Sequence, residues 1–183
     1  MKTRQPLIMT ARISKDDLKP FSQLRRAYFP PVRNFLQAHL TMFHRLPGEY
    51  MARAVDTLEE VAAETAPITA EVTELRHLGA GVAFTIASLH LHRVHAKLRS
   101  ALISWLGGQD MQKWKPHMTI QNKVSRFAAD GLYHRLAADF RPWTIAIIGF
   151  DLWRYLDGPW AHQTTVLFWA RQTGTAGALG PQT

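Results

Sequence analysis

The stretch HLTM at residues 39–42 returns as HMTI at residues 117–120, so the pattern His-apolar-Thr-apolar occurs twice. On a β-strand, side chains two residues apart point to the same face and lie roughly 6–7 Å apart. His39 with Thr41, and His117 with Thr119, would each present an imidazole beside a hydroxyl, while the apolar residues point into a core. Two such strands facing across a cleft would offer one substrate the groups needed to cut a phosphodiester without a metal.

A third match to His-x-Thr begins at His162, but its surroundings differ. Gln163 and Thr165 are polar, so this segment lacks the apolar residues that make the other two copies amphipathic strands. We interpret His162 as an ordinary strand histidine, and His39 and His117 as the functional pair.

Composition narrows the class of protein. The 183 residues are 46% hydrophobic, which suits one domain or two small lobes that share a core. The absence of cysteine excludes disulfides, iron–sulfur clusters, thiolate zinc sites and cysteine nucleophiles, and it fits a cytoplasmic protein. No apolar run reaches about eighteen residues, so neither a transmembrane helix nor a membrane partner is expected.

The formal net charge of +8 has two interpretations. The excess lysine and arginine residues are dispersed along the chain, as on many solvated basic surfaces. The same charges can line a groove that binds an anionic partner, such as RNA or a nucleotide. Charge alone leaves both interpretations open.

The order of predicted elements repeats. After a first strand over residues 6–13, the order helix, motif strand, helix, strand, strand is predicted twice, over residues 16–28, 38–46, 49–65, 67–78 and 81–88, and again over residues 91–105, 116–124, 127–140, 143–154 and 161–170. Asp16 and Asp17 are predicted to cap the first helix. We therefore predict an α+β fold, a bilobal pseudo-two-fold repeat with antiparallel sheets around a central cleft, over residues 1–172. A disordered tail is predicted at residues 173–183.

The paired histidines suit acid–base catalysis. Because histidine titrates near pH 6.5, one imidazole can take a proton from an attacking water while the other gives a proton to the leaving oxygen. The hydroxyls of Thr41 and Thr119 can donate to phosphate oxygens. Strand alternation adds Arg45 and Lys123 as candidate phosphate-binding cations, although each can equally be a solvated charge at a strand end.

The two motifs, their separation and the repeated order of elements resemble the 2H phosphoesterase superfamily, above all its 2′-5′ RNA ligase and RNA 2′,3′-cyclic phosphodiesterase branch. The resemblance extends to about residue 170. It implies a bilobal α+β protein that opens 2′,3′-cyclic phosphate ends of RNA to 2′-phosphates, or reversibly joins RNA ends through a 2′-5′ bond, without metal, ATP or another cofactor. It also implies that His39 donates a proton to the leaving 3′-oxygen, that His117 activates water, and that Thr41 and Thr119 hold the phosphate.

Two stretches depart from the family pattern. Relatives often continue the first motif with Phe-Leu-Gly, where this chain has FHRL at residues 43–46. Many relatives have an arginine soon after the second motif, where Gln121 and Asn122 stand here. Residues that flank the motifs shape the pocket, so these departures bear on the substrate rather than on the acid–base pair.

Other candidate sites have weaker support. His90, His92 and His95 begin a predicted helix, but no carboxylate accompanies them, so we predict no metal site there. Tyr155 and Trp160 flank a predicted turn and are candidates for stacking on a base. No glycine-rich phosphate loop occurs, which argues against a nucleotide cofactor.

We expect a monomeric, cytoplasmic phosphodiesterase that acts without a metal on RNA or a nucleotide with a cyclic phosphate. A 2′-5′-linked oligonucleotide is the alternative substrate for the same mechanism. A non-catalytic RNA-binding protein is the alternative class, and an assay with a 2′,3′-cyclic nucleotide in EDTA separates it from the enzymes.

Overall fold

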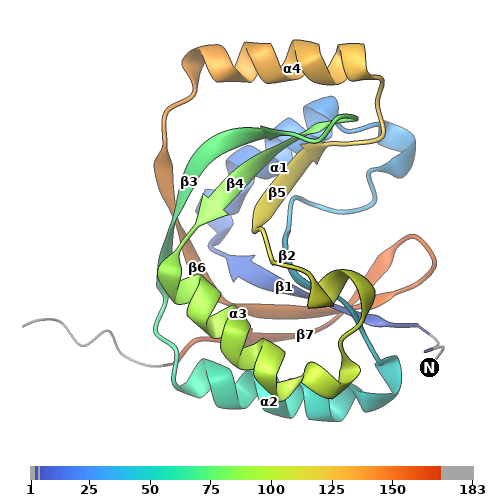
Figure 1. Cartoon of the computed structure of the whole chain (residues 1–183), viewed down its shortest axis with the longest axis vertical. Helices are drawn as coiled ribbons and strands as arrows, with labels where there is room; N and C mark the ends of the chain where they lie inside the picture. Colours follow the sequence, from blue (N-terminus) through green and yellow to red (C-terminus); the bar gives the residue numbers. More distant parts are fainter. Residues whose placement is uncertain (1–2, 4, 170–183) are drawn as a thin grey trace, which may run out of the picture.

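Antiparallel strands form the framework of the molecule (Figure 1). The computed structural model describes residue 3 and residues 5–169, so the tail predicted at residues 173–183 lies outside the described residues. The strands are β1 (Leu7–Ile13), β2 (Leu40–Leu46), β3 (Ile68–His77), β4 (Val82–Ala87), β5 (His117–Gln121), β6 (Trp143–Tyr155) and β7 (Trp160–Leu167).

The strands form one sheet in the order β1-β2-β5-β4-β3-β6-β7. Because β1 also pairs with β6, from Leu7↔Arg154 to Ile13↔Ile147, the sheet closes into a barrel, and β7 lies on the outer side of β6. The predicted α+β class with antiparallel strands is confirmed. The strands of both halves of the chain share this single sheet instead of forming separate ones.

The α-helices are α1 (Lys15–Tyr28), α2 (Met51–Ala63), α3 (Leu89–Ala101) and α4 (Arg126–Asp139). The hydroxyls of Ser14, Ser88 and Ser125 cap α1, α3 and α4 by accepting a backbone N–H of the first turn. The prediction that Asp16 and Asp17 cap α1 was wrong, because Ser14 is the N-cap and its hydroxyl also donates to Asp17 at 2.6 Å. Within the described part of the chain, no helix has the length and apolar character that crossing a bilayer requires.

The helices gather at opposite ends of the barrel (Figure 1). α1 contacts β5, and α4 contacts β3 and β4. α2 contacts β6 and β7 and has α3 beside it, which also contacts β3. The predicted order of elements is present twice along the chain, but strands of one half pair with strands of the other half. The β3–β4 hairpin of the first half pairs with β5 of the second half, and β1 takes the place beside β2.

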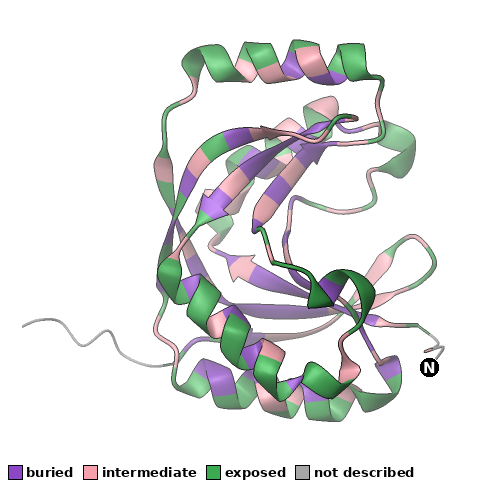
Figure 2. Cartoon of the chain, in the orientation of Figure 1, coloured by how far each residue is buried: buried purple, intermediate pink, exposed green. Residues whose placement is uncertain are grey.

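The apolar residues of both motifs are anchored in the core. Leu40, Met42, Met118 and Ile120 are buried, as the alternation within each motif predicts. Figure 2 shows buried residues concentrated on the strands and exposed residues on the outer faces of the helices. Burying one such side chain contributes about 1.5–3 kcal/mol, so the motif strands are held firmly from their apolar side.

Both motif strands change register directly after their threonine. In β2, the partners of Thr41 and Phe43 on β1 are consecutive residues, so the residue between them forms a bulge. In β5, the partners of Thr119 and Gln121 on β4 are likewise consecutive. Each bulge reverses the alternation, so Phe43 and Gln121 are buried and the side chains beyond them change face.

Candidate active site

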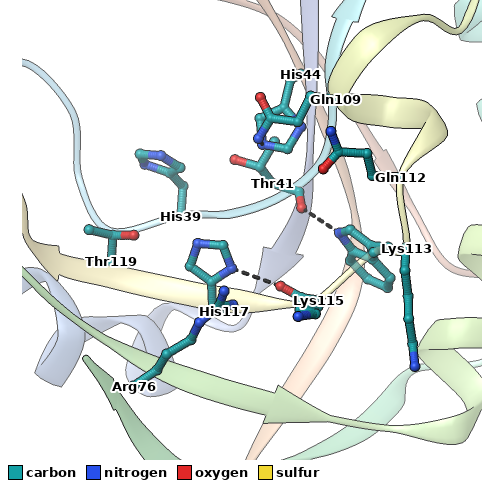
Figure 3. Close-up of a pocket in the computed structure, with 11 residues that line it drawn as sticks. His39, Thr41, His44, Arg76, Gln109, Gln112, Lys113, Lys115, His117 and Thr119 are labelled. Atoms are coloured by element: carbon teal, nitrogen blue, oxygen red, sulfur yellow. Dashed lines mark hydrogen bonds between the residues drawn. The ribbon is translucent and has the colours of Figure 1, made fainter. Parts of the chain in front are cut away.

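The two motifs meet at one cavity of about 270 Å³. Its lining includes His39, Thr41, His117 and Thr119, and Figure 3 shows their side chains around the same space. His39 and His117 are 78 positions apart in the sequence, as are Thr41 and Thr119, and the fold brings both pairs to one cavity.

The two motif strands are neighbours in the sheet. Leu40 of β2 pairs with Met118 of β5, and this is the one pair that joins these strands. Continuing the antiparallel register by one residue places each histidine opposite the threonine of the other motif. The motifs therefore approach side by side in one sheet, not across a gap between two sheets as the repeat predicted.

Both histidine rings are oriented in the same way by the backbone. His39 Nδ1 lies 2.8 Å from the carbonyl oxygen of Gln37, and His117 Nδ1 lies 2.7 Å from that of Lys115. A carbonyl oxygen only accepts, so Nδ1 of each ring carries the hydrogen and donates it. Nε2 is then the atom of each ring that can take up or release a proton.

The electrostatic surroundings keep both rings neutral in the ligand-free protein. Burial lowers the pKa of His39 to about 4, although the hydrogen bond to Gln37 opposes this, and the charge of Arg25 lowers the pKa further. Burial also lowers the pKa of His117, and the nearby charge of Arg76 adds to the decrease. An anionic ligand would raise both pKa values, because a nearby negative charge favours the imidazolium.

Cationic side chains that the sequence analysis did not assign to the site also line the cavity. They are Arg76, Lys113 and Lys115, and no carboxylate stands among the lining residues. Arg76 reaches the site along a row across the sheet, because it pairs with Ala83 of β4, which in turn pairs with Thr119 of β5. Such a row exists only in the folded sheet, whereas Lys113 and Lys115 stand four and two residues before His117 and could have been suspected.

One residue of the cavity lining, Trp114, also contacts the backbone of the first motif. Trp114 Nε1 donates to the carbonyl oxygen of Thr41 at 3.0 Å, and its ring stacks on His95 with centroids 4.1 Å apart. His95 is buried and its Nε2 donates to the carbonyl oxygen of Met42 at 3.2 Å. His95 therefore has a packing role, and within residue 3 and residues 5–169 no group of three His, Cys, Asp or Glu is arranged to hold a metal.

Comparison with known proteins identifies the family. Residues 14–159 match the 2′-5′ RNA ligase superfamily. This chain belongs to that superfamily. The resemblance to 2H phosphoesterases that the paired motifs predicted is thus confirmed, although no curated protein sequence matches the chain.

Several solved structures share the fold of this chain. The protein TT0787 of Thermus thermophilus has a TM-score of 0.65 and 15% identity over 89% of this chain and 97% of that chain. A structure described as a phosphoesterase has a TM-score of 0.61 and 15% identity over 90% and 98%. E. coli LigT complexed with 3′-AMP has a TM-score of 0.58 and 15% identity over 90% and 98%.

In this member of the 2′-5′ RNA ligase superfamily, the cations predicted from strand alternation lie outside the cavity. The prediction that Arg45 and Lys123 share the faces of the motif histidines was wrong, because the bulges reverse the alternation. Arg45 borders an adjoining cavity of about 780 Å³, which shares His44 and Gln109 with the first cavity. Lys123 is exposed in the turn after β5, which ends at Gln121 and not at the predicted Val124.

The bulge in β2 brings a third histidine to the cavity in place of Arg45. His44 lines the cavity, and its ring Nδ1 lies 2.9 Å from a carboxylate oxygen of Asp110. The two residues are 66 positions apart, so nothing in the sequence linked them. Two glutamines from the segment around Asp110, Gln109 and Gln112, also line the cavity.

An aromatic residue borders the site on the side of the first histidine. The ring centroids of Trp160 and His39 lie 4.7 Å apart, and both residues line a neighbouring cavity of about 640 Å³. Tyr155 pairs with Trp160 in the β6–β7 hairpin but lines neither cavity. His162 also lies outside both cavities, where its Nε2 lies 3.2 Å from Asp151.

Proposed function

We propose that this chain is a metal-independent phosphodiesterase that opens 2′,3′-cyclic phosphates of RNA or of nucleotides. One observation carries the proposal: two imidazoles, each held through Nδ1 with Nε2 left for proton exchange, line the same cavity as two threonines. A protein that only binds RNA has no need of this arrangement. With a 5′-hydroxyl of RNA in place of water as the nucleophile, the same site would join RNA ends through a 2′-5′ bond, again with the 3′-oxygen as the leaving group.

In the proposed reaction, His117 Nε2 takes a proton from a water molecule whose oxygen forms a bond to phosphorus. The bond between phosphorus and the 3′-oxygen breaks, and protonated His39 donates its Nε2 proton to that oxygen. The product is a 2′-phosphate, and each proton transfer contributes roughly 10²–10⁴ in rate. The assignment of acid to His39 and base to His117 follows the family resemblance.

The charges around the cavity suit this reaction. The substrate phosphate favours the imidazolium of His39, so the acid acquires its proton when the substrate binds. Thr41 and Thr119 would donate to the non-bridging oxygens, whose charge grows in the transition state. Arg76 and Lys115 supply positive charge on the His117 side.

The neighbouring cavity supports a nucleotide as the substrate. The active-site cavity of about 270 Å³ lies below the usual range of about 300–1,000 Å³ for pockets that enclose whole ligands. We propose that it takes the cyclic phosphate and ribose, and that the base extends beside His39 toward Trp160. Stacking of a base on an aromatic ring contributes about 1–3 kcal/mol.

The test is hydrolysis of a 2′,3′-cyclic nucleotide by the purified chain in EDTA, with the product identified by ³¹P NMR. We expect turnover that survives chelation and yields the 2′-phosphate. A 2′-5′-linked dinucleotide is assayed in parallel, and its preferential cleavage would assign the alternative substrate. Turnover of neither compound would refute the proposal.

A further inference from the structure

His44 stands in the stretch where this chain departs from the family pattern, and it faces the active site. It reaches the cavity only because of the bulge in β2. Its anchor is Asp110, which lies on the 3₁₀ helix Gly108–Met111 and is 7% exposed. A buried carboxylate that faces a cavity histidine outside the motif pair calls for a functional explanation.

The position of His44 is tightly determined. The Asp110 carboxylate accepts from the backbone N–H of His44 at 2.8 Å, from that of Arg45 at 3.0 Å and from His44 Nδ1 at 2.9 Å. Burial by itself raises the pKa of Asp110, but these hydrogen bonds outweigh it and hold the pKa below its ordinary value. Asp110 is therefore ionised and can only accept, so His44 Nδ1 donates and His44 Nε2 is directed elsewhere.

His44 Nε2 belongs to a group of hydrogen-bonding side chains at one side of the cavity. The amide nitrogen of Gln109 lies 3.2 Å from His44 Nε2, and Gln112 and Lys113 also line the cavity. Figure 3 shows His44, Gln109 and Gln112 on the far side of Thr41 from Thr119. The reaction proposed above uses the opposite side, so this second group of donors has no role in it.

We propose that His44, Gln109, Gln112 and Lys113 bind a second phosphate group of the same substrate. The inference rests on the proposed function and extends it to the substrate class. The amides of Gln109 and Gln112 and the ammonium of Lys113 would donate to the phosphate oxygens, and Nε2 of the His44 ring would contact the same group. The second phosphate can be an internucleotide phosphodiester of RNA or a terminal phosphomonoester.

The experiment compares three substrates that share one reacting group. They are a 2′,3′-cyclic nucleotide, the same nucleotide with an added 5′-phosphate, and a dinucleotide that ends in a 2′,3′-cyclic phosphate. The readout is the preference ratio, defined as kcat/KM with the second phosphate divided by kcat/KM without it. We expect a ratio well above one for the phosphomonoester or for the dinucleotide, and the larger ratio identifies the source of the second phosphate.

Two substitutions of His44 separate binding from packing. His44→Asn keeps a donor near Nδ1 for Asp110 but removes the group at Nε2, so the preference ratio should fall about tenfold, mainly through KM. His44→Gln places an amide near the Nε2 position and should restore part of the ratio. His90→Asn, at an exposed position of α3, is the matched control and should leave the ratio unchanged.

Titration of nucleoside 2′-phosphate and nucleoside 2′,5′-bisphosphate tests the same contact without turnover. The bisphosphate should bind more tightly to the wild type, and His44→Asn should remove that advantage. If no cyclic phosphate is hydrolysed but this advantage is present, the proposed activity fails and the second phosphate site stands. An unchanged preference ratio in His44→Asn, or an equal loss for all three substrates, would overturn the inference.

Discussion

β2 and β5 carry the same motif and use it in the same way, yet their surroundings differ. In both, histidine Nδ1 donates to the carbonyl two residues earlier, and a bulge follows the threonine. β2 then continues to Leu46 and brings His44 to the cavity, whereas β5 ends at Gln121. His39 lies against Trp160, and the charge of Arg76 acts on His117.

Some features of each histidine are fixed within its motif, and others depend on residues elsewhere in the chain. The motif specifies how one ring is held and which of its nitrogens is left for chemistry, because those contacts are local to four or five residues. The neighbours specify charge and shape, and they come from β3, the β6–β7 hairpin and the segment around Asp110. Two strands with equivalent motifs therefore place their histidines in different surroundings, as the proposed acid and base roles require.

The largest expected effect is the loss of kcat when either motif histidine is removed. His39→Ala and His117→Ala should each reduce kcat for a 2′,3′-cyclic nucleotide by roughly 10²–10⁴, because each removes one proton-transfer group. His162→Ala is the control and should retain wild-type kcat, since His162 lies outside the cavity. Full activity in either motif variant, with circular dichroism showing an intact fold, would contradict a two-histidine mechanism.

Substitution of the two motif threonines tests whether both of them hold the substrate phosphate. Thr41→Val and Thr119→Val preserve the side-chain shape and remove the hydroxyl, so each should lower kcat by roughly 10²–10³. Thr41→Ser and Thr119→Ser keep the donor and should recover most of the rate. Steady-state kinetics on the four variants checks this, and a loss confined to one strand would show that one threonine alone holds the phosphate.

Acid stability probes the packing behind β2. Burial lowers the pKa of His95 to about 4 from 6.5, so its neutral form stabilises the fold above pH 6.5 and this contribution is lost as the pH falls toward 4. The shift corresponds to about 3 kcal/mol of unfolding free energy. Urea denaturation at several pH values measures how the free energy of unfolding depends on pH. His95→Phe should flatten the pH dependence by about this amount, and an unchanged slope would exclude His95 as the cause.

The smallest expected effect is a shift of the pH profile, because different charges surround the two motif histidines. Because the pKa values of both motif histidines lie below 6.5, kcat/KM should be greatest on the acidic side of that pH and fall above it. Arg76 lowers the pKa of His117, so Arg76→Gln should move one limb of the profile toward higher pH. Arg93→Gln, an exposed substitution on α3, should leave the profile in place. A shift toward lower pH in Arg76→Gln would reverse the assigned sign.

Much of the chain could be predicted from local patterns. Helical and strand periodicity located the elements to within a few residues, because burial of one face requires that spacing in any fold. The apolar positions of the motifs predicted the buried faces of β2 and β5, as Met42 and Ile120 show. The pattern His-apolar-Thr-apolar identified the family, since it is confined to short segments whose geometry is set by the strand itself.

The sequence by itself thus determined the class of the fold and the family, and it predicted the two histidines that line one cavity. Only the tertiary structure decided what surrounds them: the closure of the sheet through β1 and β6, the row that brings Arg76 to Thr119, and the bulges that exclude Arg45 and admit His44. The physical reason is that alternation is a property of one strand. Register and bulges depend on the partner strand, which lies elsewhere in the chain.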